Sequence, residues 1–198
     1  IQNPLELRPT GGFIGSFALL TFDKGKLLDV QVQDSYAADN LLKGKVEPPD
    51  DLQKYLSEKQ WYFRDSNWSP DFPKTARQAA WFIEKEMGIK TDGTIGIDAN
   101  TLQELLRAVG PVRVADYDNE SVSVENIFER LQNRSELSVS LTGTKKREYL
   151  TALSSAVFSA VQTVRDTETA EKVGAAFLLT LETSDTLIVV NDTSIQQT

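Results

Sequence analysis

The sequence contains neither cysteine nor histidine. Their absence excludes cysteine nucleophiles, Ser-His-Asp triads, zinc sites built from thiolates or imidazoles, and acid–base catalysis by histidine. Any chemistry must therefore use carboxylates, Arg, Lys, Tyr, Ser or a metal ion bound by oxygen ligands. A chain without cysteine is compatible with an oxidising compartment, although cytosolic proteins can lack cysteine too.

Long apolar runs are also missing. No run approaches the roughly 20 residues that span a bilayer, and no signal peptide is recognisable. The chain starts at Ile1 without a methionine and ends at Thr198, shortly after the apolar stretch 187–190. We therefore expect a fragment of a longer protein, attached to a membrane only through a segment absent from this sequence.

Positive charge is in the minority. The 21 Lys and Arg residues face 29 Asp and Glu residues, which gives a net charge of −8. A nucleic-acid binder needs clustered cations for the phosphates, and so does a protein that docks on an anionic membrane. The composition therefore argues against both, while leaving room for local basic pockets.

What is present is the composition of an ordinary soluble domain. Apolar residues make up 40% and charged residues 25% of the 198 positions, enough for a sizeable core. No internal repeat, low-complexity stretch or linker interrupts the chain. We therefore expect residues 1–198 to form a single domain.

A polar loop followed by a hairpin organises residues 6–36. Residues 17–22 and 27–33 read as two strands, and Gly25 supplies the positive φ of a tight turn between them. The return strand alternates apolar and polar residues, so it should be half buried. Because a hairpin brings its outer ends together, segments 8–16 and 34–36 should meet at one edge of the sheet.

The rest of the chain alternates helical and strand patterns. Capped helices are predicted at 50–56, 73–87, 98–109, 123–133, 145–164 and 171–181, and strands at 94–97, 112–114 and 186–190. The proline-broken segment 61–73 should be an ordered loop. This pattern predicts an α/β fold, a three-layer α-β-α sandwich whose mixed sheet contains the hairpin and the strands at 94–97 and 186–190.

Two loops carry candidate binding residues. Thr10, Gly11 and Gly12 can expose successive backbone N–H groups as an anion-binding nest beside Arg8, or they can simply begin the hairpin. In the second loop, residues 64–69, Arg64 suits an oxyanion, Asp65 and Asn67 suit hydroxyls or a hydrated cation, and Trp68 suits a sugar face. The alternative for this loop is a self-satisfied turn in which Arg64 pairs with a carboxylate and Trp68 covers the core.

Two long blocks carry a family resemblance. The blocks are Gln2 to Ser16, which includes Arg8, Thr10, Gly11, Gly12 and Ser16, and the run Arg-Asp-Ser-Asn-Trp-Ser-Pro-Asp-Phe-Pro at 64–73. They resemble the bacterial domain-of-unknown-function family 4012, over nearly the whole chain. That family has no established activity to carry over.

A more distant similarity is to the LytR-CpsA-Psr proteins. Those membrane-anchored enzymes move glycopolymers from a polyprenyl pyrophosphate carrier to peptidoglycan outside the cell, and Arg-Asp pairs on the two hairpin strands hold the pyrophosphate and its magnesium. The element order agrees, but the second strand here ends in Gln33-Asp34, so the Asp matches and the arginine does not. At the first strand, Arg8 lies upstream of the two glycines without an adjacent Asp. Arg64 can supply the missing charge from the neighbouring loop.

The resemblance implies a LytR-CpsA-Psr-like fold and an extracytoplasmic, cell-envelope site. Arg8, Arg64 and a magnesium held by Asp34 or Asp65 would neutralise a pyrophosphate, while Thr10, Gly11, Gly12, Ser16, Asn67 and Trp68 would contact the ligand. A carboxylate would take the proton from an attacking sugar hydroxyl. Two alternatives stay open: a non-catalytic module that binds glycan or a polyprenyl carrier, and a structural surface or adhesion domain.

Overall fold

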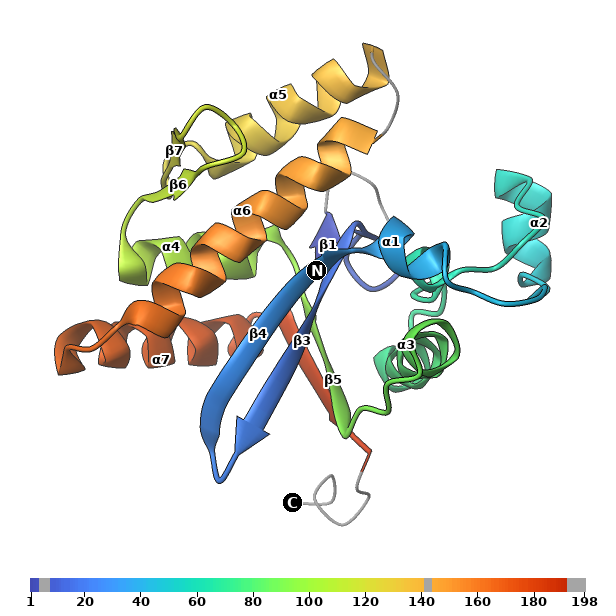
Figure 1. Ribbon diagram of the computed structural model, residues 1–198, viewed down its shortest axis with the longest axis horizontal. Helices are drawn as coiled ribbons and strands as arrows, with labels where there is room; N and C mark the ends of the chain where they lie inside the picture. Colours follow the sequence, from blue (N-terminus) through green and yellow to red (C-terminus); the bar gives the residue numbers. More distant parts are fainter. Residues whose placement is uncertain (4–7, 141–143, 192–198) are drawn as a thin grey trace.

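The computed structural model describes residues 1–3, 8–140 and 144–191 (Figure 1). Within these ranges the chain is a mixed α/β structure with seven α-helices and four two-stranded antiparallel sheets. None of the helices in these ranges is long and apolar enough to cross a membrane. The α/β class predicted from the sequence is therefore confirmed.

The central hairpin consists of β3 (Ser16–Asp23) and β4 (Lys26–Asp34). Their register pairs Ser16 with Asp34 at the open end, as expected for outer ends that meet. At the other end Lys24 and Gly25 have φ values of 48° and 78°, the two positive values of a type I′ turn. The strand pairing predicted from the sequence is confirmed.

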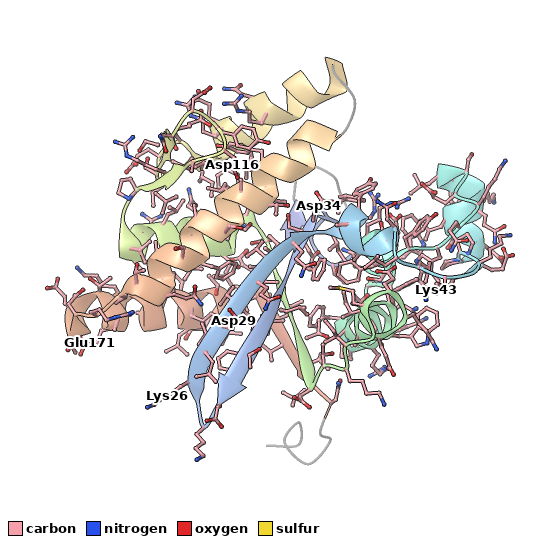
Figure 2. The ribbon with its side chains drawn as sticks, viewed as in Figure 1. Lys26, Asp29, Asp34, Lys43, Asp116 and Glu171 are labelled. Carbon is pink, nitrogen blue, oxygen red and sulfur yellow. The ribbon has the colours of Figure 1, made fainter. Side chains whose placement is uncertain are left out.

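The return strand is less buried than its alternation predicts. The first half of β4 is exposed throughout, and Leu28 keeps 61% of its surface exposed. In Figure 2, Lys26 lies at the projecting tip of the hairpin, away from the helices, whereas Asp34 lies where β4 meets α1. The expectation of a half-buried strand was therefore wrong for the outer half of the hairpin, because that half projects beyond the elements that would cover it.

Short elements around the hairpin hold the loops that carry the candidate residues. β1 (Gln2–Asn3) pairs with β2 (Phe13–Ile14), and Arg8 lies in the chain between these paired strands. α1 (Ser35–Asp39) follows β4 directly. The sequence predicted none of these three elements, since two-residue strands and a one-turn helix leave almost no periodicity to read.

The segment between α1 and α3, and α3 itself, follow the prediction. They contain α2 (Asp50–Leu56), the 3₁₀ turn η1 (Phe63–Asp65) and α3 (Phe72–Met87). The Asp71 side chain caps α3 by accepting from Lys74 N, and Gly88 ends the helix at φ 73°. η1 lies inside the segment that was expected to be an ordered loop.

The second half of the chain has the predicted elements with shifted bounds. They are β5 (Gly93–Ile97), α4 (Ala99–Val109), β6 (Val112–Val114), β7 (Glu120–Val122), α5 (Ile127–Ser140), α6 (Thr144–Thr163), α7 (Thr167–Glu182) and β8 (Thr186–Val190). α5 begins four residues after Ser123, the predicted cap, because residues 123–126 form a turn that Asn126 closes by accepting from Ser123 N. The sequence predicted no strand at the position of β7.

The strands do not join into one sheet. β5 pairs with β8 and β3 pairs with β4, as separate two-stranded ladders. The single mixed sheet expected from the sequence is therefore not formed by these strands, and the three-layer sandwich is not confirmed. β8 has β5 as its one partner among the described strands and leaves Ile188 43% exposed.

Two clusters of buried side chains form the core. One contains Phe17, Phe63 and Phe82 and lies under β3, η1 and α3. The other contains Leu102, Ile127 and Leu153 and lies among α4, α5 and α6. Figure 1 shows α1–α3 on one side of strands β3–β5 and α4–α7 on the other. The candidate residues lie beside the first cluster.

Candidate functional site

Arg8 and Arg64 converge on one carboxylate, that of Asp65. Arg8 Nη2 lies 3.4 Å from Asp65 Oδ1, and Arg64 Nε lies 3.4 Å from Asp65 Oδ2. The side chain of Asp65 is 5% exposed, while those of Arg8 and Arg64 keep 16% and 15% exposed. The expectation that the two arginines reach a common anion is met by a side chain of the protein itself.

Arg64 makes a second and shorter ion pair. Its Nη1 donates to Asp39 Oδ2 at 2.8 Å. The guanidinium carbon also lies 4.7 Å from the ring centre of Tyr36 and 4.3 Å from that of Tyr62, so two tyrosines flank the cation. Two carboxylates and two rings fix the position of this side chain.

The local fold explains why Arg64 and Asp65 lie here. Both belong to η1, and Phe63 in the same turn packs edge-on against Phe17 of β3, with ring centres 5.2 Å apart. Trp61 Nε1 donates to the Asp65 carbonyl at 3.0 Å, and the Trp61 ring packs against Phe82 of α3. Aromatic packing on the core therefore anchors the turn that presents the charges.

Two further acidic residues, Asp39 and Glu86, extend this group, and their burial disfavours the charged carboxylate. Burial raises the pKa of Asp39 to about 6, although the hydrogen bond and charge of Arg64 oppose the shift. Burial, and then the charge of Asp39, raises the pKa of Glu86 to about 7, against a hydrogen bond from Phe63 N and the charge of Arg64. Asp39 Oδ1 and Glu86 Oε2 are buried and have no hydrogen-bond partner among the described residues. We call Arg8, Asp39, Arg64, Asp65 and Glu86 the Asp65 cluster.

Asp34 and Ser16 lie at the open end of the hairpin, with other partners. Asp34 Oδ1 accepts from Tyr36 N at 2.8 Å and so caps α1. Ser16 is buried, and its hydroxyl is 2.8 Å from that of Thr151 on α6. Within the described ranges, no group of three or more acidic side chains is placed to hold a metal ion. A magnesium at Asp34 and Asp65 stays a prediction.

The backbone groups of the expected anion nest bind within the protein. Gly11 N donates to the Arg8 carbonyl at 3.1 Å, and Gly12 N donates to Gln2 Oε1 at 3.0 Å. Gln2 Oε1 also accepts from the Thr10 hydroxyl at 3.2 Å and from Asn67 Nδ2 at 3.3 Å. The glycine loop therefore follows the simpler alternative, a turn, because the buried Gln2 amide occupies its centre.

Asn67 bonds to groups of the protein itself. Asn67 is fully buried, and its Nδ2 donates to the Gly12 carbonyl at 2.6 Å, which joins the two candidate loops. Trp68 is half-buried. Glu6, a residue expected to neighbour Arg8, lies outside the described residues. The two loops do meet, as predicted, but Asn67 ties them together through the protein's own groups.

One known protein family matches the part of the chain that contains this site. The family described as a protein of unknown function (DUF4012) matches residues 1–135. The chain belongs to the DUF4012 family. No curated protein and no solved structure matches the chain. Every residue of the Asp65 cluster falls inside the matched range, so the cluster belongs to the part of the chain that defines its membership.

Sequence reasoning missed three members of the site. Asp39 ends a helix that was not predicted, Glu86 sits in a run of charged residues on α3, and Gln2 lies in a strand of two residues. For Glu86 a signal was available: positions 79, 82, 83 and 86 fall on one face of α3, and the other three are apolar and buried. A charged residue on the buried face of a helix calls for a partner or a function.

Proposed function

We propose that this domain binds a pyrophosphate-bearing glycan carrier outside the cytoplasmic membrane, as a distant relative of the LytR-CpsA-Psr phosphotransferases with a related α/β fold. One observation carries the proposal: Arg8 and Arg64, from separate loops, point their guanidinium groups at a single anionic group. Two arginines around one anion are the arrangement that binds phosphate oxygens in many proteins. A polyprenyl-pyrophosphate-linked glycan is the ligand that this relationship implies.

The arginines keep the means to bind an external anion. Their contacts with Asp65 are both 3.4 Å, longer than the roughly 2.7–2.9 Å of a good charge-assisted hydrogen bond. Both side chains also keep about 15% of their surface exposed. A diphosphate carries more charge than one carboxylate, so it competes well for the two guanidinium groups.

The neighbouring acids suit the proton transfer of such a reaction. When a sugar hydroxyl attacks the phosphorus, its proton needs an acceptor, and an acid whose pKa lies near neutrality is effective in that role. Asp39 and Glu86, with pKa values of about 6 and 7, are the candidates. Arg8 and Arg64 would stabilise the charge on the transferring phosphoryl oxygens.

Magnesium would be held by Asp34 and Asp65, where it would offset the charge of the diphosphate. Asp65 already contacts two cations and Asp34 caps α1, so these carboxylates alone make a poor cation site. We therefore expect magnesium or manganese to bind weakly, and chiefly when a diphosphate is present. No step of the proton transfer requires the metal.

Calorimetry with farnesyl pyrophosphate, a soluble polyprenyl pyrophosphate, tests the proposal. The unchanged chain should bind it, more tightly with magnesium, and Arg8→Ala or Arg64→Ala should abolish binding while the circular dichroism spectrum is kept. Arg→Lys should recover little, because the bidentate contact is lost. Arg107→Ala is the matched control, since Arg107 pairs with Glu104 on the exposed face of α4. Failure of the unchanged chain to bind, with and without magnesium, would overturn the proposal.

A second candidate function is that of a structural surface or adhesion domain. It is favoured by the internal pairing of the polar loops, in which Asp39 and Asp65 neutralise the arginines and Gln2 occupies the glycine turn. In that case the same Arg→Ala variants lower the melting temperature, and no farnesyl pyrophosphate binds to the unchanged chain. The one set of titrations and melting curves separates the two candidates.

A further inference from the structure

A second candidate site lies on the exposed face of α3, opposite the buried face that carries Glu86. An open groove of about 340 Å³ is lined there by Arg77, Trp81 and Glu84 of the helix, by Lys90 and Thr91 of the loop after it, and by Asn191 after β8. Its volume is at the lower end of the range of small-molecule sites, roughly 300–1,000 Å³. Arg77, Trp81 and Glu84 are spaced three and four residues apart, so they share one face of the helix.

Trp81 gives the groove an aromatic wall. The residue is 38% exposed, while its ring is supported edge-to-face by the fully buried Phe82, with centres 5.0 Å apart. A partly exposed indole held in a fixed position is a suitable surface for the C–H face of a sugar ring, because it offers a large rigid apolar area at little entropic cost. A tryptophan needed only for the core would turn this surface inward.

The charges around the groove have the opposite sign to the chain as a whole. Among the described lining residues, Arg77 and Lys90 are basic and Glu84 is acidic, in a chain whose net charge is −8. Lys85 Nζ lies 5.8 Å from the centre of the Trp81 ring. Lys90 is 3.7 Å from Glu84, whereas Arg77 has no carboxylate within ion-pair distance among the described residues. The groove therefore has cationic charge left for a ligand.

The far wall is fixed to the sheet. Asn191 Nδ2 donates to the Thr91 carbonyl at 2.6 Å, and Asn191 N donates to the Asp92 carbonyl at 2.8 Å. These bonds tie the end of β8 to the loop that precedes β5. Polar groups on a fixed wall opposite an aromatic ring can orient the hydroxyl groups of a sugar.

We propose that this groove binds an acidic oligosaccharide, with one sugar ring on the face of Trp81 and the negative group of the sugar on Arg77. The negative group can be the carboxylate of a uronic acid or a phosphate on the glycan. The site is separate from the Asp65 cluster and does not need a diphosphate there. It adds a contact for the glycan to the proposed function, but it stands on different residues.

The test is calorimetric and fluorimetric titration of the whole chain with sugars of one length. Tetragalacturonate and a hyaluronan tetrasaccharide are the acidic probes, a phosphorylated maltotetraose carries the phosphate, and maltotetraose is the neutral control. At least one charged probe should bind more tightly than maltotetraose and change the tryptophan fluorescence. Binding of none of the charged probes, or equal binding of charged and neutral sugars, would overturn the proposal.

Variants identify the residues. Trp81→Ala should weaken binding about tenfold or more, and Trp81→Phe, which keeps a ring on Phe82, should recover part of it. Arg77→Ala should remove the preference for charged over neutral sugar, and because Arg77 is exposed this variant should fold normally. Arg107→Ala should change nothing. Unchanged affinity in both Trp81→Ala and Arg77→Ala would place the sugar elsewhere and overturn the proposal.

The two proposals fail separately. If farnesyl pyrophosphate does not bind but a charged tetrasaccharide binds through Trp81, the groove stands and the diphosphate site falls. If farnesyl pyrophosphate binds and no sugar does, the reverse holds. Trp81→Phe should leave farnesyl pyrophosphate affinity unchanged, which separates a lost groove from a damaged domain.

Discussion

Two clusters in this chain use the same parts in different surroundings. In the Asp65 cluster two arginines share Asp65, and in a second cluster two arginines share Glu120. Glu120 lies 3.3 Å from Arg130 and 3.4 Å from Arg134, and it accepts a hydrogen bond from the buried Tyr149 at 3.0 Å. We call Tyr117, Glu120, Arg130, Arg134 and Tyr149 the Glu120 cluster.

The difference between the clusters is access to water. The side chains of Arg130 and Arg134 are 36% and 30% exposed, about twice the values for Arg8 and Arg64. The Asp65 cluster also includes Asp39 and Glu86, two buried acids with raised pKa values, one oxygen of each lacking a partner among the described residues. Ion pairs near water need little explanation, whereas unfavourable buried charge is commonly found at functional sites. The comparison therefore singles out the Asp65 cluster.

The largest expected effect is on Asp65. Asp65→Ala removes the carboxylate that both Arg8 and Arg64 contact and leaves two mostly buried cations close to each other. We expect the free energy of unfolding to fall by about 3–5 kcal/mol, as when one partner of a buried ion pair is removed. Urea unfolding followed by circular dichroism measures it. A loss no larger than that of Glu120→Ala would mean that burial does not separate the two clusters.

The next effect concerns pH and Glu86. Because its folded pKa, about 7, lies above the ordinary value of 4.5, the folded chain holds this proton over a range where the unfolded chain has lost it. Its contribution to stability is therefore full below about pH 4.5 and is lost as the pH rises through 7. Glu86→Gln should remove that slope and stabilise the fold by roughly 3 kcal/mol at pH 8, because each pKa unit between the folded and the ordinary value corresponds to about 1.4 kcal/mol.

The matched control for this experiment is Glu84→Gln. Glu84 lies on the exposed face of the same helix, so Glu84→Gln removes a carboxylate from α3 without touching its buried face. Asp39, with a pKa of about 6, titrates in part of the same window with the same sign, so the comparison is made between variant and parent at each pH. An identical slope in Glu86→Gln and in the parent would show that Glu86 is charged in the fold at neutral pH.

A smaller effect is expected in the Glu120 cluster. Glu120→Gln keeps an acceptor for the Tyr149 hydroxyl and removes the charge that faces Arg130 and Arg134. Because both arginines can turn to water, we expect a loss of about 1 kcal/mol. Thermal unfolding at fixed pH measures it. A loss as large as that of Asp65→Ala would contradict the role assigned to solvent access.

The sequence predicted the elements of this fold better than its contacts. The hairpin, α3 and α4 follow from strong local signals: the Gly25 turn, Pro73 in the first turn of α3, Gly88 after its end and the Asp98 cap. The joining of strands into sheets depends on contacts distant in sequence, so the expected single sheet was wrong. Residue types alone also did not show that Gln2 would lie where its amide closes the glycine turn.

The same limit applies to the candidate site. Arg8 and Arg64 were expected to reach a common anion because the resemblance called for a second cation beside Arg8, and the two arginines do converge on Asp65. Asp39 was not expected, because its burial follows from contacts that the sequence does not show, whereas Glu86 could have been found from the buried apolar face of α3 that it shares. The pKa values that mark the Asp65 cluster are a property of packing, not of spacing.

The smallest expected effect is the change with salt concentration of the coupling energy of one ion pair in each cluster. Double-mutant cycles for Arg134 with Glu120 and for Arg64 with Asp39 report each pair without the side effects of single substitutions. For Arg134 and Glu120, 3.4 Å apart with the arginine 30% exposed, we expect a coupling below about 1 kcal/mol that shrinks in 1 M salt. For Arg64 and Asp39, 2.8 Å apart with the carboxylate 3% exposed, the coupling should be larger and nearly independent of salt, because ions do not reach the pair.

Unfolding free energies of the four chains of each cycle, in 0.05 M and 1 M sodium chloride, provide the measurement. Equal salt sensitivity of the two couplings would show that water reaches both clusters alike, and the electrostatic distinction between them would then have to be withdrawn.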